Sequence, residues 1–80
     1  MRLDKYLKVS RLIKRRTVAN EMAGLDRIKI NDRVAKAGSE VKPGDILEIS
    51  FGQGTSKIRV LEVRESVRKE EAEELYELLK

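Results

Sequence analysis

Seven of the eighteen lysine and arginine residues of this 80-residue chain lie among its first sixteen positions, with a single acid between them. Seven positive charges and one negative charge give this segment a net charge of +6, whereas the whole chain carries +4. A dense cationic face binds a polyanion without a deep pocket, because each neutralised phosphate releases condensed counterions. The cluster therefore predicts a nucleic-acid site, made by Arg2, Lys5, Lys8, Arg11, Lys14, Arg15 and Arg16.

A charge run more often forms the solvated side of an ordinary helix. Such helices usually mix signs to make i,i+4 pairs, however, and here no acid follows Asp4 until Glu21. We expect Asp4 itself to pair with Lys8 or a neighbouring arginine and to orient it. Tyr6 is expected to pack at the edge of the core rather than stack on a base, because it lies at helical spacing from Leu3.

The residue types that enzymes use most often for acid-base, nucleophilic or metal chemistry are missing. The chain has no histidine and no cysteine, so such sites reduce to Asp, Glu, Lys, Tyr and Ser. Ser10 and Lys14 stand four residues apart, but this spacing arises by chance in any lysine-rich helix. Gly52-Gln53-Gly54 lacks the Lys-Ser/Thr pair and the helix of a phosphate loop. We predict a binding protein without a cofactor or metal, and not an enzyme.

Two short helices are expected to position the basic residues. Apolar residues recur at helical spacing over about residues 2–10 and again after Arg16, but the two stripes are not continuous. The basic stretch 11–16 is therefore placed as a turn, with the second helix beginning near Arg16. The N–H groups at that helix start would add to the attraction for phosphate.

Alternating polar and apolar residues after the second helix predict a small antiparallel sheet. Val41-Lys42-Pro43-Gly44-Asp45 suits a tight turn, in which Pro43 fixes φ and Gly44 accepts a positive φ. The expected strands cover residues 27–31, 34–36, 46–51 and 57–64, and a glycine-rich hairpin loop joins the last two.

From residue 66 onward the pattern predicts a third helix. Ala72, Leu75, Tyr76 and Leu79 follow i,i+3,i+4,i+7 spacing, and glutamates cluster toward the start, where the helix dipole favours them. Residues 65–80 carry six acids and three bases, a net charge of −3. Phosphate would repel this end, so we expect it to lie apart from the basic start in a complex. Residues 1–65 would then bind the ligand, and 66–80 would form a separate acidic helix.

Length and hydropathy set the remaining expectations. A chain this short buries about 60% of its unfolded surface, which fits one small domain. No apolar run approaches the roughly 20 residues of a membrane span, and the start lacks the apolar stretch of a signal peptide. We expect a cytoplasmic monomer without a membrane partner.

Taken together, the motifs resemble the RNA-binding domain named after ribosomal protein S4. The resemblance covers about residues 1–52 and implies an α+β fold with the alpha-L motif, in which two short N-terminal helices pack on a small antiparallel sheet. The opening RLDKYLKVSRLIKRRT and the full length resemble a stand-alone branch that includes the small ribosome-associated heat-shock protein. The motifs are Arg2-Leu3-Asp4-Lys5 with Leu7, Arg16 at the start of the second helix, Arg27-Ile28-Lys29-Ile30-Asn31, and Val41-Lys42-Pro43-Gly44-Asp45.

This resemblance implies an RNA-binding ribosome quality-control factor. Such a protein would bind stalled large ribosomal subunits that carry peptidyl-tRNA, and would contact rRNA and tRNA. It would support tailing of the nascent chain by a partner of the NEMF/RqcH type. By position, Arg2 and Arg16 match the principal RNA-contacting arginines of the family, and Lys5 and the 11–15 run flank them.

Four other positions bear on the fold that the resemblance implies. Asp4 and Leu7 match positions that hold the first helix against the second. Asp26 and Asp32 stand at turns where the family commonly has glycine. Aspartate tolerates the left-handed region better than most non-glycine residues, so we expect the fold to persist.

Two alternative functions remain open at this point. A DNA-binding protein would carry a similar basic face, although two short helices on a small sheet offer a flat surface rather than one long helix for the major groove. A detached accessory RNA-binding domain that recruits an RNA-modifying enzyme would also fit.

Overall fold

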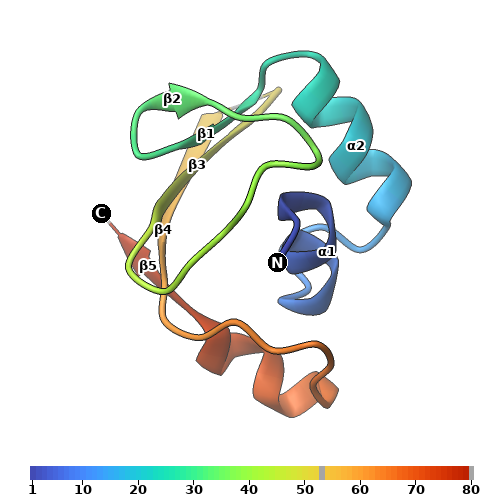
Figure 1. The fold of residues 1–80 in the computed structure, drawn as a ribbon, viewed down its shortest axis with the longest axis vertical. Coiled ribbons are helices and arrows are strands. Elements are labelled where there is room, and N and C mark those ends of the chain that lie inside the picture. The colour runs from blue at the N-terminus through green and yellow to red at the C-terminus, as the bar shows by residue number, and fades with distance from the viewer. Residues whose placement is uncertain (53, 80) are drawn as a thin grey trace.

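Helices α1 (Leu3–Val9) and α2 (Arg16–Gly24) pack on one side of an antiparallel sheet (Figure 1). The computed structural model describes residues 1–52 and 54–79, and over these residues five strands form the sheet in the order β2-β1-β3-β4-β5. The predicted α+β fold, with N-terminal helices on a small antiparallel sheet, is confirmed. The remaining elements are β1 (Ile28–Ile30), β2 (Arg33–Val34), β3 (Ile46–Phe51), β4 (Gly54–Val60), a 3₁₀ helix η1 (Lys69–Leu75) and β5 (Tyr76–Leu79).

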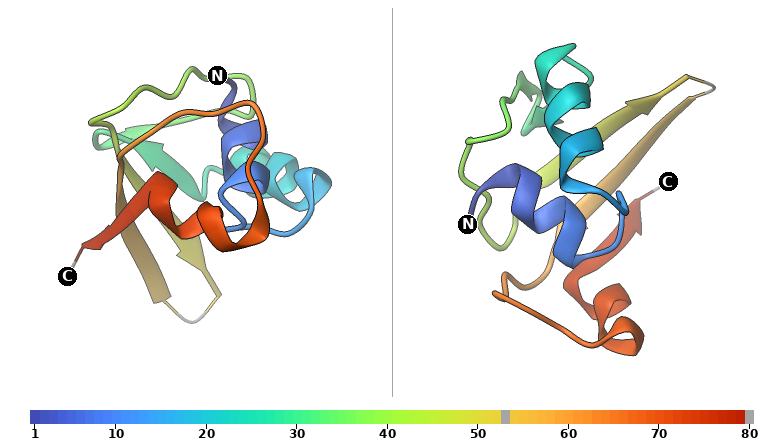
Figure 2. Two further views of the ribbon diagram at one scale, coloured as in Figure 1. Left: turned by 90° about the horizontal axis from the view of Figure 1, so that it is seen from below. Right: turned by 90° about the vertical axis from the view of Figure 1, so that its right-hand side faces the viewer.

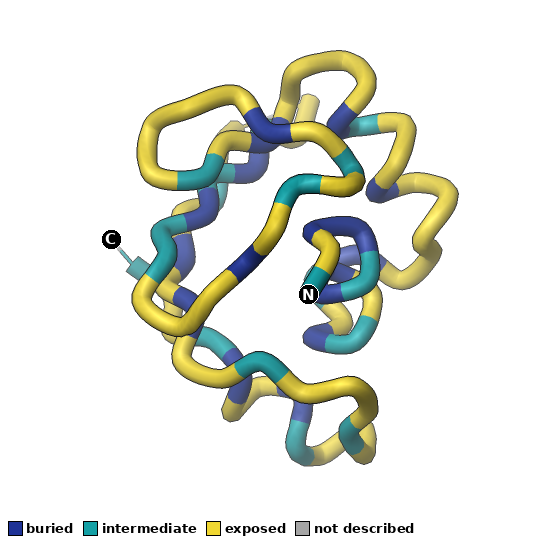
Figure 3. Tube along the Cα trace, viewed as in Figure 1, coloured by how far each residue is buried: buried dark blue, intermediate teal, exposed yellow. Residues whose placement is uncertain are grey.

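The hydrophobic core fills the space between the two helices and the sheet (Figures 2 and 3). Tyr6 of α1 packs in the core, as predicted, but it is fully buried rather than at the edge, and its hydroxyl donates a hydrogen bond of 2.7 Å to the Leu75 carbonyl. On the sheet, Leu47 pairs with Ile58 across β3 and β4, so these side chains share the face that meets the helices. The larger core residues are Leu3, Tyr6, Leu7, Ile28, Val41, Leu47, Ile49, Ile58, Val60 and Leu75.

The turns of the sheet use the residues that the sequence analysis assigned to them. Gly44 has φ +94°, and the Asp45 N–H donates to the Lys42 carbonyl at 3.1 Å, which closes the predicted turn. Asp26 and Asp32 have φ of +58° and +68°. Both therefore adopt the left-handed conformation that glycine favours, which explains why glycine is common there in the resembled family.

Three strands differ in extent from their predicted ranges, and the smallest difference is in β1, which lacks one predicted residue at each end. Strand β4 is shifted toward the N-terminus and ends at Val60. The Val60 N–H donates to the Asp45 carbonyl, and the Leu61 N–H donates to the Leu75 carbonyl instead of continuing the pairing with β3. The return strand β2 starts at Arg33 because Arg33 pairs directly with Ile30 across a two-residue turn. The predicted hairpin loop between β3 and β4 includes residue 53, which lies outside the described residues.

The predicted third helix is wrong over its last turn. Residues 69–75 form the 3₁₀ helix η1, and residues 76–79 instead form strand β5 along the edge of β4. In an α-helix the Leu75 carbonyl would accept a bond from Leu79. Here that carbonyl already accepts bonds from the Tyr6 hydroxyl and from the N–H groups of Leu61 and Glu62. These tertiary contacts outweigh the local helical pattern.

Candidate nucleic-acid interface

Asp4 is the centre of a polar cluster that joins α1 to α2. Its side chain is 1% exposed, and its Oδ2 accepts hydrogen bonds from Arg16 Nε at 3.0 Å and Asn20 Nδ2 at 2.9 Å. Its Oδ1 accepts bonds from Arg2 Nε at 3.2 Å and from the Lys5 N–H at 2.8 Å. Asp4 pairs with neighbouring arginines, as predicted, and its partners are Arg2 and Arg16 rather than Lys8.

The cluster holds two guanidinium groups side by side at the surface. The side chains of Arg2 and Arg16 are 57% and 46% exposed, and Asp4 engages only Nε and Nη2 of each. A guanidinium carries five N–H donors, so each keeps donors for a further acceptor. Gly38 lies against Arg2, since a Cβ at position 38 would be 3.9 Å from the guanidinium carbon. The pair therefore presents unused N–H donors at the surface in a fixed geometry, which is chemically suited to an anionic oxygen acceptor.

The backbone around Arg2 is fixed by the loop that precedes β3. The Leu3 N–H donates to Ser39 at 2.8 Å, and the Asp4 N–H donates to Ala37 at 3.1 Å. The Val41 N–H in turn donates to the Met1 carbonyl at 2.8 Å. These bonds position the start of the chain before α1 begins.

The electrostatic balance in the cluster favours ionised Asp4. Burial raises the pKa of its carboxyl, but hydrogen bonds from Arg16, Asn20 and Arg2 and the charge of Arg16 lower it more, to about 2 from an ordinary value of 3.8. Because the carboxylate stays charged, it offsets part of the repulsion between the two arginines.

We predict that part of the free energy of unfolding depends on ionised Asp4 and is lost in acid. Because its folded pKa is depressed, Asp4 stabilises the fold above pH 3.8, and this contribution is lost as the pH falls toward 2. The shift corresponds to about 2 kcal/mol. Urea unfolding should show that the unchanged protein loses about 2 kcal/mol more than an Asp4→Asn variant between about pH 5 and about pH 2. Equal losses in the two proteins would contradict this assignment.

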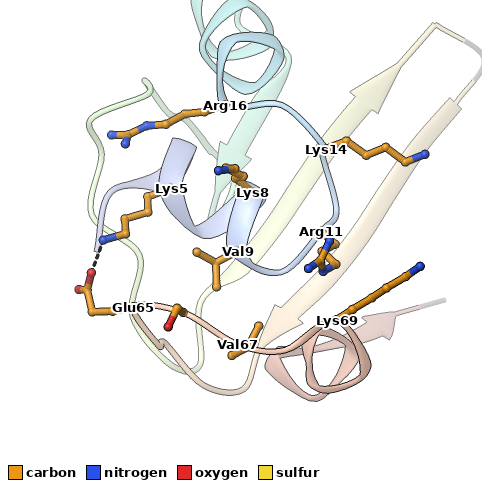
Figure 4. A pocket seen from close by; sticks show the side chains of 10 residues that line it. Lys5, Lys8, Val9, Arg11, Lys14, Arg16, Glu65, Val67 and Lys69 are labelled. Carbon is orange, nitrogen blue, oxygen red and sulfur yellow. Dashed lines mark hydrogen bonds and ion pairs between the residues drawn. The ribbon is translucent and has the colours of Figure 1, made fainter.

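A groove of about 750 Å³ runs between α1 with its following loop and residues 65–69 (Figure 4). The first wall of the groove, formed by α1 and the loop up to Arg16, brings together five of the seven predicted site residues. Arg16 belongs both to this wall and to the Asp4 cluster, so the groove and the arginine pair form one continuous surface. Arg15 is exposed just before α2 but does not line the groove. The five predicted residues in the groove are Lys5, Lys8, Arg11, Lys14 and Arg16.

The loop between α1 and α2 is held in place although its charged side chains are exposed. Ile13 is 6% exposed, and its N–H donates to the Leu7 carbonyl at 3.1 Å. Arg11 has a positive φ of 61°, and its N–H donates to the Lys8 carbonyl at 3.0 Å. An apolar anchor inside the loop thus presents Arg11 and Lys14 to solvent.

Residues 65–69 lie beside the basic start of the chain, whereas the expected separation of the two ends applies to a complex with RNA and stays a prediction. Glu65 forms an ion pair with Lys5, and Lys69 lines the same groove as Arg11 (Figure 4). The hydrogen bond and positive charge of Lys5 lower the pKa of the Glu65 carboxyl. Net charge alone does not indicate this contact, because burial of Ala72 and Leu75 decides where the segment lies.

Sequence reasoning missed Asn20, Glu65 and Lys69. Asn20 could have been found, because it lies one helical turn after Arg16 and donates both to Asp4 and to the Arg16 carbonyl. The other two have no local signal, since their place depends on the path of the chain after β4.

Metal-ligand clusters and membrane-spanning helices are both absent from residues 1–52 and 54–79. In that part of the chain, no group of His, Cys, Asp or Glu side chains is arranged to hold a metal ion. Nor does any helix there combine the length and apolar character required to cross a membrane.

Comparison with known proteins defines the class to which this fold and site belong. The S4 domain matches residues 1–47, which is more than half of the chain. The chain therefore belongs to the S4-domain family, as its motifs predicted.

Similarity to individual proteins extends beyond this domain to the full chain. The chain is 59% identical over 80 residues to the RQC P-site tRNA stabilizing factor of Halalkalibacterium halodurans, covering 100% of this chain and 91% of the relative. It is 56% identical over 80 residues to the protein of the same name from Bacillus subtilis, covering 100% and 93%. The trimeric structure of heat shock protein 15 from Vibrio cholerae matches with a TM-score of 0.91 at 28% identity, covering 99% and 81%. The predicted resemblance to this branch of the family is confirmed.

Proposed function

We propose that this protein is a non-enzymatic ribosome quality-control factor that binds the large ribosomal subunit and a tRNA in the P site. The observation that carries the proposal is the pair Arg2 and Arg16, held on Asp4 beside a groove lined by further cations. Two guanidinium groups fixed on one carboxylate suit bidentate, charge-assisted contacts to RNA phosphates. The similarity over the full chain to proteins named RQC P-site tRNA stabilizing factor supports the same role.

The finer features of this function also belong to the proposal. The protein would recognise stalled large subunits that carry peptidyl-tRNA, contact both rRNA and tRNA, and hold the tRNA while a NEMF/RqcH-type partner extends the nascent chain. It would act in the cytoplasm as a monomer. Its principal contacts would be Arg2 and Arg16, with the surrounding lysines and arginines supplying a supporting positive field.

Sedimentation of the purified protein with ribosomal subunits tests this function directly. We expect it to travel with large subunits that carry peptidyl-tRNA, and much less with empty large subunits or with small subunits. Binding should depend strongly on salt, falling about a thousandfold between about 50 and about 200 mM if about six phosphates are contacted. Absence from the large-subunit fraction, or equal binding to duplex DNA at the same salt concentration, would contradict the proposal.

A further inference from the structure

Residues 65–69 form a fixed second wall of the groove rather than a loose tail. Directly after this segment, Ala72 and Leu75 are 2% and 0% exposed, so η1 is anchored in the core. Directly before it, Arg64 forms ion pairs with Glu62 at 3.2 Å and with Glu71 at 3.4 Å. A segment secured on both sides has a defined position opposite α1.

The chemistry of the groove changes from one end to the other (Figure 4). At one end, the Lys5–Glu65 ion pair places an acid against a base. In the middle, the half-buried side chains of Val9 and Val67 project from the two walls. At the other end, Arg11 and Lys69 lie on the two walls with Lys14 nearby. The surface thus combines an apolar middle with a strongly cationic end.

We propose that this groove is a second RNA contact, which takes a single unpaired strand. Phosphates of the strand would bind Arg11, Lys14 and Lys69, and its riboses and bases would lie against Val9 and Val67. A volume of about 750 Å³ admits a few nucleotides but not a base-paired helix. Single-strand sites commonly combine a positive track with aromatic surfaces for bases, and here Val9 and Val67 supply an apolar surface in place of aromatic rings. The inference rests on the proposed function and extends the RNA-binding surface into the C-terminal segment.

Glu65 limits where along the groove a phosphate can bind. Its carboxylate occupies Lys5 in the same way that a phosphate oxygen would, so a strand can use Lys5 only by displacing Glu65. The cationic end offers phosphate no such competitor among the residues that line the groove, where Glu65 is the sole acid. Phosphates are therefore directed toward Lys69.

Binding to short RNA probes tests the groove independently of the ribosome. The probes are a labelled single-stranded oligouridylate and an RNA duplex of the same length, measured by fluorescence anisotropy at several salt concentrations. For Lys69→Gln we expect weaker binding of the single strand, and a salt slope smaller by about 1, as for loss of one phosphate contact. The matched control is Lys57→Gln, because Lys57 is exposed on the opposite face of the sheet from its buried neighbour Ile58.

A crosslink locates the bound strand. The chain has no cysteine, so Ser66→Cys places a unique photoactivatable label on the second wall. We expect this label to react with the oligouridylate, whereas a label on exposed Thr55→Cys should not. The groove proposal is overturned if Lys69→Gln behaves like Lys57→Gln, or if Ser66→Cys gives no RNA crosslink. The proposed ribosomal function fails separately, if the unchanged protein does not sediment with large subunits.

Discussion

Replacing Arg16 by alanine should lower the affinity of the protein for large ribosomal subunits by about thirtyfold. One charge-assisted hydrogen-bonded contact is worth about 2 kcal/mol, and every 1.4 kcal/mol changes affinity about tenfold. The change also removes one partner of Asp4, but Arg2 and Asn20 remain bonded to that carboxylate. We therefore expect a loss of only about 1 kcal/mol in folding stability. Co-sedimentation at fixed salt measures the affinity, and urea unfolding measures the stability.

Two further substitutions show whether the loss of binding by Arg16→Ala is specific to this arginine. Arg59 is about as exposed as Arg16 and also pairs with an acid, Glu77 at 3.3 Å. It lies on the face of the sheet that points away from the helices, because its neighbours Ile58 and Val60 are buried. Arg59→Ala should leave binding nearly unchanged. Arg16→Lys keeps the positive charge without the planar fork and should lie between the two. If Arg16→Ala and Arg59→Ala bind equally well, the arginine pair is not the contact.

Replacing Asp4 by alanine should cause the largest loss of stability among the site residues. The change leaves Arg16 and Asn20 without the carboxylate that joins α1 to α2. Breaking a buried pair costs about 3 kcal/mol or more, but exposure of the arginines to water reduces this, so we expect about 2 to 3 kcal/mol. The free energy of unfolding of a domain is only about 5 to 15 kcal/mol, so the fraction unfolded rises measurably. Urea titration followed by circular dichroism checks the value.

The role of Asp4 can be separated from a general effect of removing an acid. Glu21 is exposed on α2, and Glu21→Ala should change stability by less than about 0.5 kcal/mol. Asp4→Ala should also weaken binding to large subunits under conditions where the variant is folded, because Arg2 and Arg16 lose their fixed geometry. If Asp4→Ala is as stable as Glu21→Ala and binds large subunits unchanged, Asp4 holds neither the two helices together nor the two arginines in place.

Local patterns predicted the parts of this fold that local forces determine. The break between the apolar stripes placed the start of α2 at Arg16, and Pro43 with Gly44 identified a turn that the structure contains. The positive φ values at Asp26 and Asp32 were instead implied by the family resemblance, because the family commonly has glycine at these two turns. In each case a few adjacent residues fix the backbone.

The second wall of the groove could not be predicted in this way. Its position depends on the Leu75 carbonyl, which accepts bonds from residues of α1 and of the chain after β4. Without those contacts, the i,i+3,i+4 spacing after residue 66 indicates an ordinary helix, and Lys69 is one lysine in an acidic segment. A count of charges therefore assigns the basic start and the acidic end to separate surfaces, although the fold places residues 65–69 beside the basic start.

The bond between Tyr6 and Leu75 also bears on when the fold can form during synthesis of the chain. It joins residues separated by 69 positions, so Tyr6 gains this buried partner only after residue 75 has been synthesised. A truncated translation product that stops before residue 75 lacks β5, the anchor of η1 and the support of the groove. The arrangement of the basic groove is thus coupled to synthesis of the segment that contains Leu75, far along the chain from α1.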